Sequence, residues 1–150
     1  MWTIALIFNI LHLAYHQVTT NFDLFPFNNI RHYKKSERIA EVAVNAVTMG
    51  FPVLALLTHR HGCIGAACFV LGFLLAGEFL TWWPCYFFGV PKALKRWREV
   101  YDRTHRHTVM ILPPIKDHPA PNLEHCMLQA LSLATFVVTV GCYVRLETAV

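Results

Sequence analysis

Residues 62–83, GCIGAACFVLGFLLAGEFLTWW, decide the fold of this chain. The stretch carries one charged residue, Glu78. At about 1.5 Å per helical residue it is long enough to cross the roughly 30 Å hydrocarbon core of a bilayer. Three further apolar runs of similar length occupy residues 2–19, 39–57 and 123–144. Because only helices and closed barrels satisfy their backbone hydrogen bonds inside lipid, the sequence predicts four transmembrane helices.

The composition agrees with a membrane protein. Of the 150 residues, 55% are hydrophobic and 15% are charged, and the mean hydropathy is +0.40. Soluble domains contain roughly 45–50% apolar and about 25% charged residues. The second and third runs are separated only by residues 58–61, so their helices must be antiparallel. We therefore predict an all-α, polytopic integral membrane protein, with residues 1–150 forming one antiparallel bundle of four transmembrane helices.

The basic residues predict the orientation in the membrane. Eleven of the 13 Lys and Arg residues fall in two loops, residues 20–38 and 84–122, and the exceptions are Arg60 and Arg145. Short loops rich in Lys and Arg stay in the cytoplasm. We therefore expect a multi-pass protein of the cytoplasmic (inner) membrane, with both long loops in the cytoplasm and both termini outside. The first run lacks a preceding Lys or Arg and a signal-peptide cleavage site, so we interpret it as a retained span.

A short basic amphipathic helix is predicted between the third and fourth spans, over about residues 90–107. Leu94, Trp97 and Tyr101 fall at helical spacing with Lys and Arg between them. This pattern is typical of a helix that lies on a membrane surface. The net charge of +4 is explained by basic residues near anionic lipid headgroups, so we expect membrane lipids as partners and no nucleic acid.

Polar side chains inside the four runs gather at one depth. Counted at about 1.5 Å per residue from the predicted span ends, they all lie within roughly 11 Å of the cytoplasmic side. The residues concerned are His12, His16, Glu41, Asn45, Glu78, Glu124 and His125. Because neighbouring helices run in opposite directions, this agreement does not follow from the order of the sequence. Ionisable groups at membrane depth are costly, so the shared layer predicts a functional site.

Imidazole nitrogens and carboxylate oxygens are typical ligands of zinc, iron and manganese. We predict a divalent transition metal in this layer. The candidate metal ligands are His12, His16, Glu41, Glu78 and His125. Glu78 and Glu124 are the candidate catalytic acids or bases, and Asn45 and Trp82 the candidate contacts to a cofactor or substrate. The pairs His59/His61 and His105/His107 are expected to be exposed to solvent and not to bind metal.

The pattern favours a metal-dependent membrane enzyme, an oxidoreductase or a hydrolase, that acts on an amphipathic or lipid-like substrate. A proton- or cation-coupled transporter or channel subunit is an alternative, as is a protein that binds haem between two histidines. In a structural alternative the polar residues only connect helices, Glu124 caps a helix, and Trp82 belongs to an interfacial aromatic belt. Assembly as a homo-oligomer or within a larger membrane complex also stays open.

Overall fold

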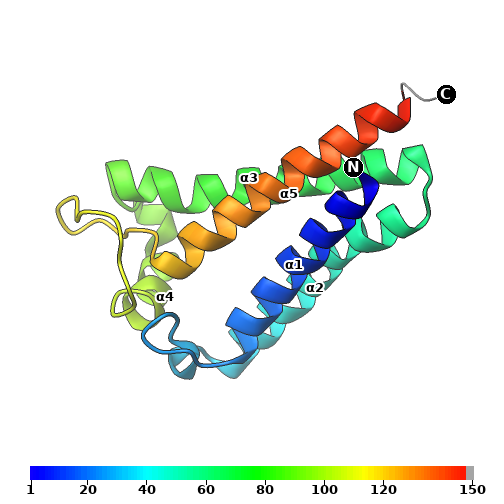
Figure 1. Cartoon of the computed structure of the whole chain (residues 1–150). Coiled ribbons are helices and arrows are strands. Elements are labelled where there is room, and N and C mark those ends of the chain that lie inside the picture. Colours follow the sequence, from blue (N-terminus) through cyan, green and yellow to red (C-terminus); the bar gives the residue numbers. More distant parts are fainter. Residues whose placement is uncertain (148–150) are drawn as a thin grey trace.

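Four long helices and one short helix form the fold, which is all-α as predicted (Figure 1). The computed structural model describes residues 1–147, so the last three residues of the predicted single domain lie outside the described residues. The long helices are α1 (Trp2–Asn21), α2 (Lys35–Leu57), α3 (His61–Phe88) and α5 (Leu123–Glu147), and the short one is α4 (Lys95–Thr104). Two single turns of 3₁₀-helix, Ile30–His32 and Lys92–Leu94, lie in the long connections.

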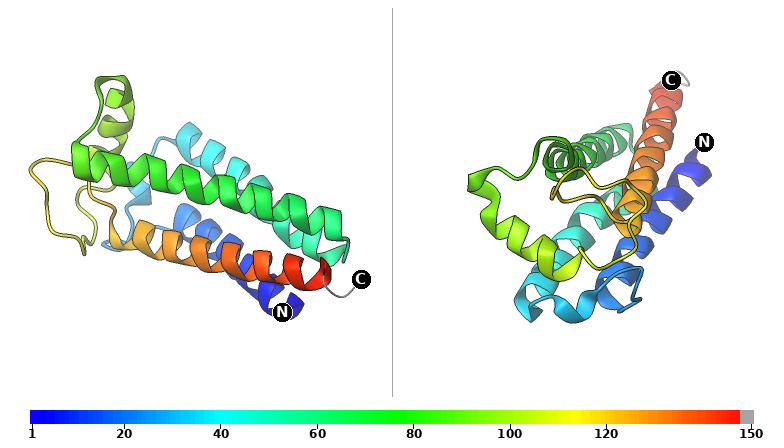
Figure 2. Two further views of the ribbon diagram at one scale, coloured as in Figure 1. Left: turned by 90° about the horizontal axis from the view of Figure 1, so that it is seen from above. Right: turned by 90° about the vertical axis from the view of Figure 1, so that its left-hand side faces the viewer.

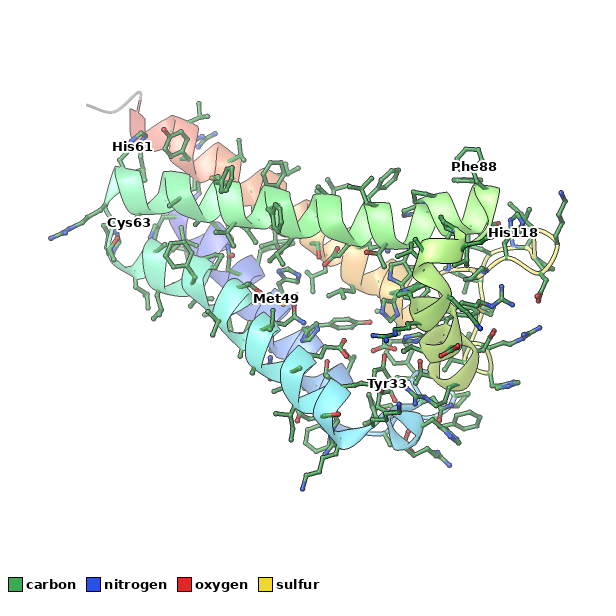
Figure 3. The ribbon with its side chains drawn as sticks, turned by 180° about the vertical axis from the view of Figure 1, so that it is seen from behind. Tyr33, Met49, His61, Cys63, Phe88 and His118 are labelled. Atoms are coloured by element: carbon green, nitrogen blue, oxygen red, sulfur yellow. The ribbon has the colours of Figure 1, made fainter. Side chains whose placement is uncertain are left out.

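The long helices pack in a closed order, with α1 and α3 each contacting both α2 and α5. The beginning of α1, the end of α5 and the short turn between α2 and α3 lie at one end of the bundle (Figures 1 and 2). The two long connections and α4 lie at the other end. Long helices that follow one another in the chain therefore run in opposite directions, as predicted. Helices α2 and α3 diverge from their turn toward α4 (Figure 3).

Within the described residues, three helices are long and apolar enough to cross a membrane, namely α2, α3 and α5. The predicted count of four spans is therefore not confirmed. The helix α1 has 20 residues and is not among these three. A multi-pass location in a membrane is plausible from the other three helices.

The face that α1 buries is polar, whereas the face it exposes is apolar. Ile4, Ile7, Ile10 and Leu11 are 47–51% exposed. The buried face is formed by Ala5, Asn9, His12, His16, Thr19 and Thr20. Soluble proteins show the opposite distribution, because water favours the burial of apolar side chains.

The predicted end of the third long helix is wrong. The apolar run ends at Trp83, before Pro84, but α3 continues through Pro84 to Phe88. Its last turn is held by Tyr86, whose hydroxyl donates to the Pro113 carbonyl at 2.8 Å. The helix ends at Gly89, where the backbone has φ 85°, a conformation that glycine adopts without strain.

The predicted interfacial helix is present but shorter than residues 90–107. Its regular part is α4, residues 95–104, and the 3₁₀ turn Lys92–Leu94 precedes it. Figure 1 shows α4 across the end of the bundle where α2 and α3 diverge. Trp97 and Tyr101, predicted to face a membrane, instead contact Trp82 of α3, with ring centroids 5.4 and 6.1 Å away.

Candidate metal centre

His105 comes directly after α4, as its C-terminal cap, and its side chain is buried. This finding corrects the prediction that His105 is exposed to solvent, while His107 is exposed as expected. Burial lowers the pKa of His105 to about 4. The imidazole is therefore neutral at neutral pH and keeps a nitrogen lone pair for a metal ion or a proton.

Tyr33 borders His105 from the other side. Its hydroxyl oxygen lies 3.0 Å from Nε2 of His105. Burial and the nearby carboxylates of Glu41 and Glu124 raise the pKa of Tyr33 above its usual value. The phenol therefore stays protonated. Its oxygen can accept a hydrogen bond from Nε2–H of His105, which leaves the lone pair of Nδ1 for a metal ion.

Ion pairs hold α4, and with it His105, in place. Arg103 of α4 contacts Glu37 of α2, with 2.6 Å between Nη2 and Oε2. Arg98 contacts Asp117 of the following connection at 2.7 Å, and this pairing lowers the pKa of Asp117. The position of His105 thus depends on contacts to two parts of the chain that are distant in sequence.

Glu124 and His125 lie in the first turn of α5 and approach His105. Within the described residues, these three form the one group of His, Cys, Asp or Glu side chains with metal-binding spacing, one ligand atom of each lying within 4.8 Å of the others. The carboxylate of Glu124 also lies beside the ring of His125, with 3.9 Å between Oε2 and Nδ1, the ring nitrogen that does not face the ion. Atoms bound to one tetrahedral zinc ion at about 2.1 Å lie about 3.4 Å apart. Binding of an ion would therefore require a movement of up to about 0.7 Å per side chain.

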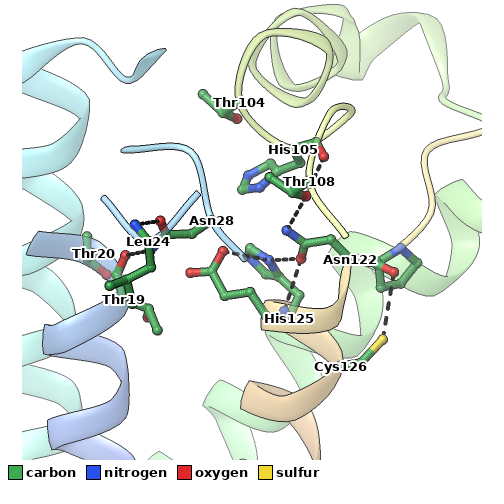
Figure 4. A network of polar contacts seen from close by, with 12 residues as sticks. Thr19, Thr20, Leu24, Asn28, Thr104, His105, Thr108, Asn122, His125 and Cys126 are labelled. Carbon is green, nitrogen blue, oxygen red and sulfur yellow. Dashed lines mark hydrogen bonds and ion pairs between the residues drawn. The ribbon is translucent and has the colours of Figure 1, made fainter. Parts of the chain in front are cut away.

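Asn122 fixes the orientation of His125 (Figure 4). Its Oδ1 accepts hydrogen bonds from the backbone N–H of His125 at 3.0 Å and from Nδ1 of the same residue at 2.7 Å. Its Nδ2 donates to Thr108 at 2.8 Å. Because Oδ1 can only accept, Nδ1 of His125 carries the proton and Nε2 presents its lone pair. Such a partner behind a ligating histidine is a common feature of metal sites.

The hydrogen bond from His125 to Asn122 gives a testable prediction. We expect Asn122→Ala to weaken zinc binding by about 10- to 100-fold, the usual cost of losing such a partner. Asn122→Asp keeps an accepting oxygen and should retain zinc affinity within a few-fold. Competition with a fluorescent zinc chelator measures both, and equal losses in the two variants would show that the hydrogen bond to Nδ1 is not what matters.

Aromatic rings surround the candidate metal centre. Trp82 is buried, and its ring centroid lies 4.3 Å from that of His125 and 5.3 Å from that of His105. The two imidazoles are 4.7 Å apart and nearly perpendicular. Trp82 therefore belongs to the wall of the site and not to an exposed aromatic belt. Its close contact with His125 leaves no space on that side for a porphyrin, which disfavours the haem alternative.

A cavity of about 260 Å³ adjoins the metal centre, and His125 belongs to both. Trp82, which contacts His125, also lines the cavity. Its polar lining is formed by His16, Glu41, Asn45, Glu78, Thr81 and His125. Of the predicted layer, all residues except His12 and Glu124 thus line one cavity. Nε2 of His16 lies 3.9 Å from a carboxylate oxygen of Glu41.

His12 lies behind this cavity. Its Nε2 is 2.8 Å from the hydroxyl of Ser132, which donates to Oε1 of Glu78 at 2.9 Å. The other oxygen of Glu78, Oε2, is buried and has no hydrogen-bond partner. His12 therefore orients Glu78 through Ser132, and Glu78 keeps one oxygen unpaired.

Of the five predicted ligands, only His125 belongs to the group with metal-binding spacing. Glu124, predicted as catalytic, is its second member, and His105 is its third. One signal could have identified His105: it follows Trp97 and Tyr101 at successive intervals of four, so it continues their helical face. Its position next to Glu124 depends on the irregular connection between α4 and α5.

Comparison with known proteins gives no relative from which a function could be transferred. No protein-family model, no curated protein and no solved structure matches this chain.

Proposed function

We propose that this protein is a metal-dependent membrane enzyme whose ion is bound by His105, Glu124 and His125. The observation that carries the proposal is the position of His125, which belongs to the metal-binding group and also lines the adjoining cavity. A substrate in that cavity would lie next to the ion. Two nitrogens and one carboxylate leave coordination positions open for water, oxygen or substrate.

The chemistry proposed for this site is activation of water or oxygen by the ion. A bound divalent ion lowers the pKa of its water toward neutrality. Glu78 lines the cavity and has an unpaired oxygen, which suits a general acid or base. Glu41, Asn45 and His16 would contact the substrate, and Trp82 would exclude water.

We further propose α1 as a fourth transmembrane span. Its apolar outer face and polar inner face suit a lipid surround, where apolar side chains face outward without cost. The long loops and α4 would then face the cytoplasm, as the distribution of Lys and Arg favours. The metal centre would lie at the cytoplasmic end of the bundle.

A second candidate function is a proton or cation pathway. It is favoured by buried polar contacts that continue along α1 and α5 beyond the cavity. Nδ2 of Asn9 donates to Oγ1 of Thr139 at 2.9 Å, and both residues are buried. With Ser132 and His12, these contacts form a polar row toward the opposite end of the bundle. A pathway of this kind would operate without a bound transition metal.

Elemental analysis of the detergent-purified protein tests the proposal. We expect about one zinc, iron or manganese ion per chain, because the three ligands form one site. His105→Ala should lose the ion. His107→Ala is the matched control, because His107 is two residues away and exposed. Equal metal content in the two variants, or none in the native protein purified without chelator and supplied with each metal, would contradict the proposal.

A further inference from the structure

The cavity beside the metal centre has an acidic, hydrogen-bond-accepting interior and apolar edges. The apolar part of its lining consists of Met49, Phe73, Leu74, Trp82 and Leu128. Among the described residues that line it, none is Lys or Arg. Two carboxylates in a lining that has no Lys or Arg disfavour a phosphate or a carboxylate as ligand and favour a cation.

The position of Glu78 indicates where a cationic group would bind. Its Oε1 accepts from Ser132, whereas Oε2 is buried without a hydrogen-bond partner. A buried carboxylate oxygen that lacks a donor is costly, so a donor in the cavity would stabilise it. Glu41 supplies a second carboxylate on the same cavity.

Most of the residues that line the cavity belong to α2 and α3, which diverge from their turn toward α4 (Figure 3). Phe73 of this lining is 75% exposed, so the lining reaches the surface there. On a membrane protein the surroundings of Phe73 are acyl chains. The volume, about 260 Å³, is below the roughly 300–1,000 Å³ of sites that enclose a whole drug-sized ligand. The cavity therefore suits a polar head and the start of a chain that continues into lipid.

We propose that the cavity binds a single-chain amphiphile with a protonated amine as its head, that is, a long-chain alkylamine. The ammonium group donates to Oε2 of Glu78 and lies near Glu41. The chain leaves between α2 and α3 past Phe73. This inference names the substrate class of the proposed enzyme and rests on that function for the reaction, but binding of the amine requires no metal.

Photolabelling tests the inference. The full-length protein is reconstituted in nanodiscs of zwitterionic lipid with dodecylamine that carries a diazirine in its chain. Dodecanoic acid with the same diazirine serves as the comparison ligand. We expect the amine to label peptides that contain Met49, Phe73 or Leu74, and the acid to label them at least tenfold less. Equal labelling by the amine and the acid would overturn the proposal.

Two pairs of variants make the test specific. Gly77→Leu places a side chain in the cavity lining. It causes no clash, because a Cβ at Gly77 meets no atom within 4 Å. Gly62→Leu is its control, because Gly62 lies at the other end of α3 and a Cβ there also meets no atom within 4 Å. Glu78→Gln removes the charge, and Glu99→Gln changes an exposed glutamate of α4. We expect Glu78→Gln to reduce labelling about tenfold or more, as for loss of a charged hydrogen bond. Gly77→Leu should reduce labelling to a similar extent, because its side chain occupies space in the cavity. Both controls should match the native protein. Undiminished labelling of Gly77→Leu would overturn the proposal.

Metal analysis of the same samples separates the two proposals. If the amine labels as expected and no sample contains metal, the enzyme proposal fails and the binding site stands. If metal is bound and the amine does not label the cavity, the binding site fails and the metal centre stands. His105→Ala, which should lose metal, should still bind the amine.

Discussion

Saturation with zinc should raise the unfolding temperature of the purified protein, and a chelator should reverse the effect. A ligand that binds only the folded state at 100 times its Kd adds about 2.7 kcal/mol to the free energy of unfolding. In detergent, thermal unfolding monitored by circular dichroism measures this shift. Glu124→Gln, which is similar in size but lacks the charge, should have an unfolding temperature that zinc leaves nearly unchanged.

Zinc binding should also stabilise one region of the chain more than the rest. His105 follows α4, whereas Glu124 and His125 begin α5, so an ion at this centre links two elements that the chain joins only through residues 106–122. Hydrogen exchange in residues 95–108 should therefore slow on addition of zinc. If zinc stabilised Glu124→Gln as much as the native protein, or if exchange slowed equally throughout the chain, the assigned ligands would be wrong.

The sequence could predict the long helices because each depends on local signals. Apolar runs of sufficient length placed all four, and α5 begins at Leu123 as predicted. The ends were less predictable, because they depend on contacts elsewhere. The continuation of α3 through Pro84, for example, is accompanied by a hydrogen bond from Tyr86 to Pro113, which no periodicity indicates.

The candidate site, too, could be predicted from the sequence only in part. The directions of the helices and the distances from their ends predicted that His16, Glu41 and Glu78 lie at the same depth. The structure places all three on one cavity. His105 could not be placed this way, because it lies outside the apolar runs. The ligand roles assigned to His12, His16, Glu41 and Glu78 stay predictions, and their spacing does not match that of the group around His125.

The polar inner face of α1 leads to the last prediction, which tests whether α1 crosses the membrane. Leu11 of α1 and Leu94, just before α4, are 51% and 42% exposed. On a soluble protein, lysine would be tolerated at either position. At the centre of a transmembrane helix a lysine costs roughly 2.5–3.5 kcal/mol on insertion scales, whereas near the membrane surface its ammonium group reaches water.

We therefore expect Leu11→Lys to reduce the amount of folded protein in the membrane fraction by more than tenfold, and Leu94→Lys to leave it nearly unchanged. Leu11→Phe, which keeps an apolar side chain, should also match the native protein. Quantification of extracted protein and its thermal unfolding measures the three variants together. If Leu11→Lys accumulated and unfolded like Leu94→Lys, α1 would face water, and the fold would contain three spans with a peripheral helix. The inverted polarity of α1 argues against that outcome, because it would leave Ile4, Ile7 and Ile10 in water while His12 and His16 stay buried.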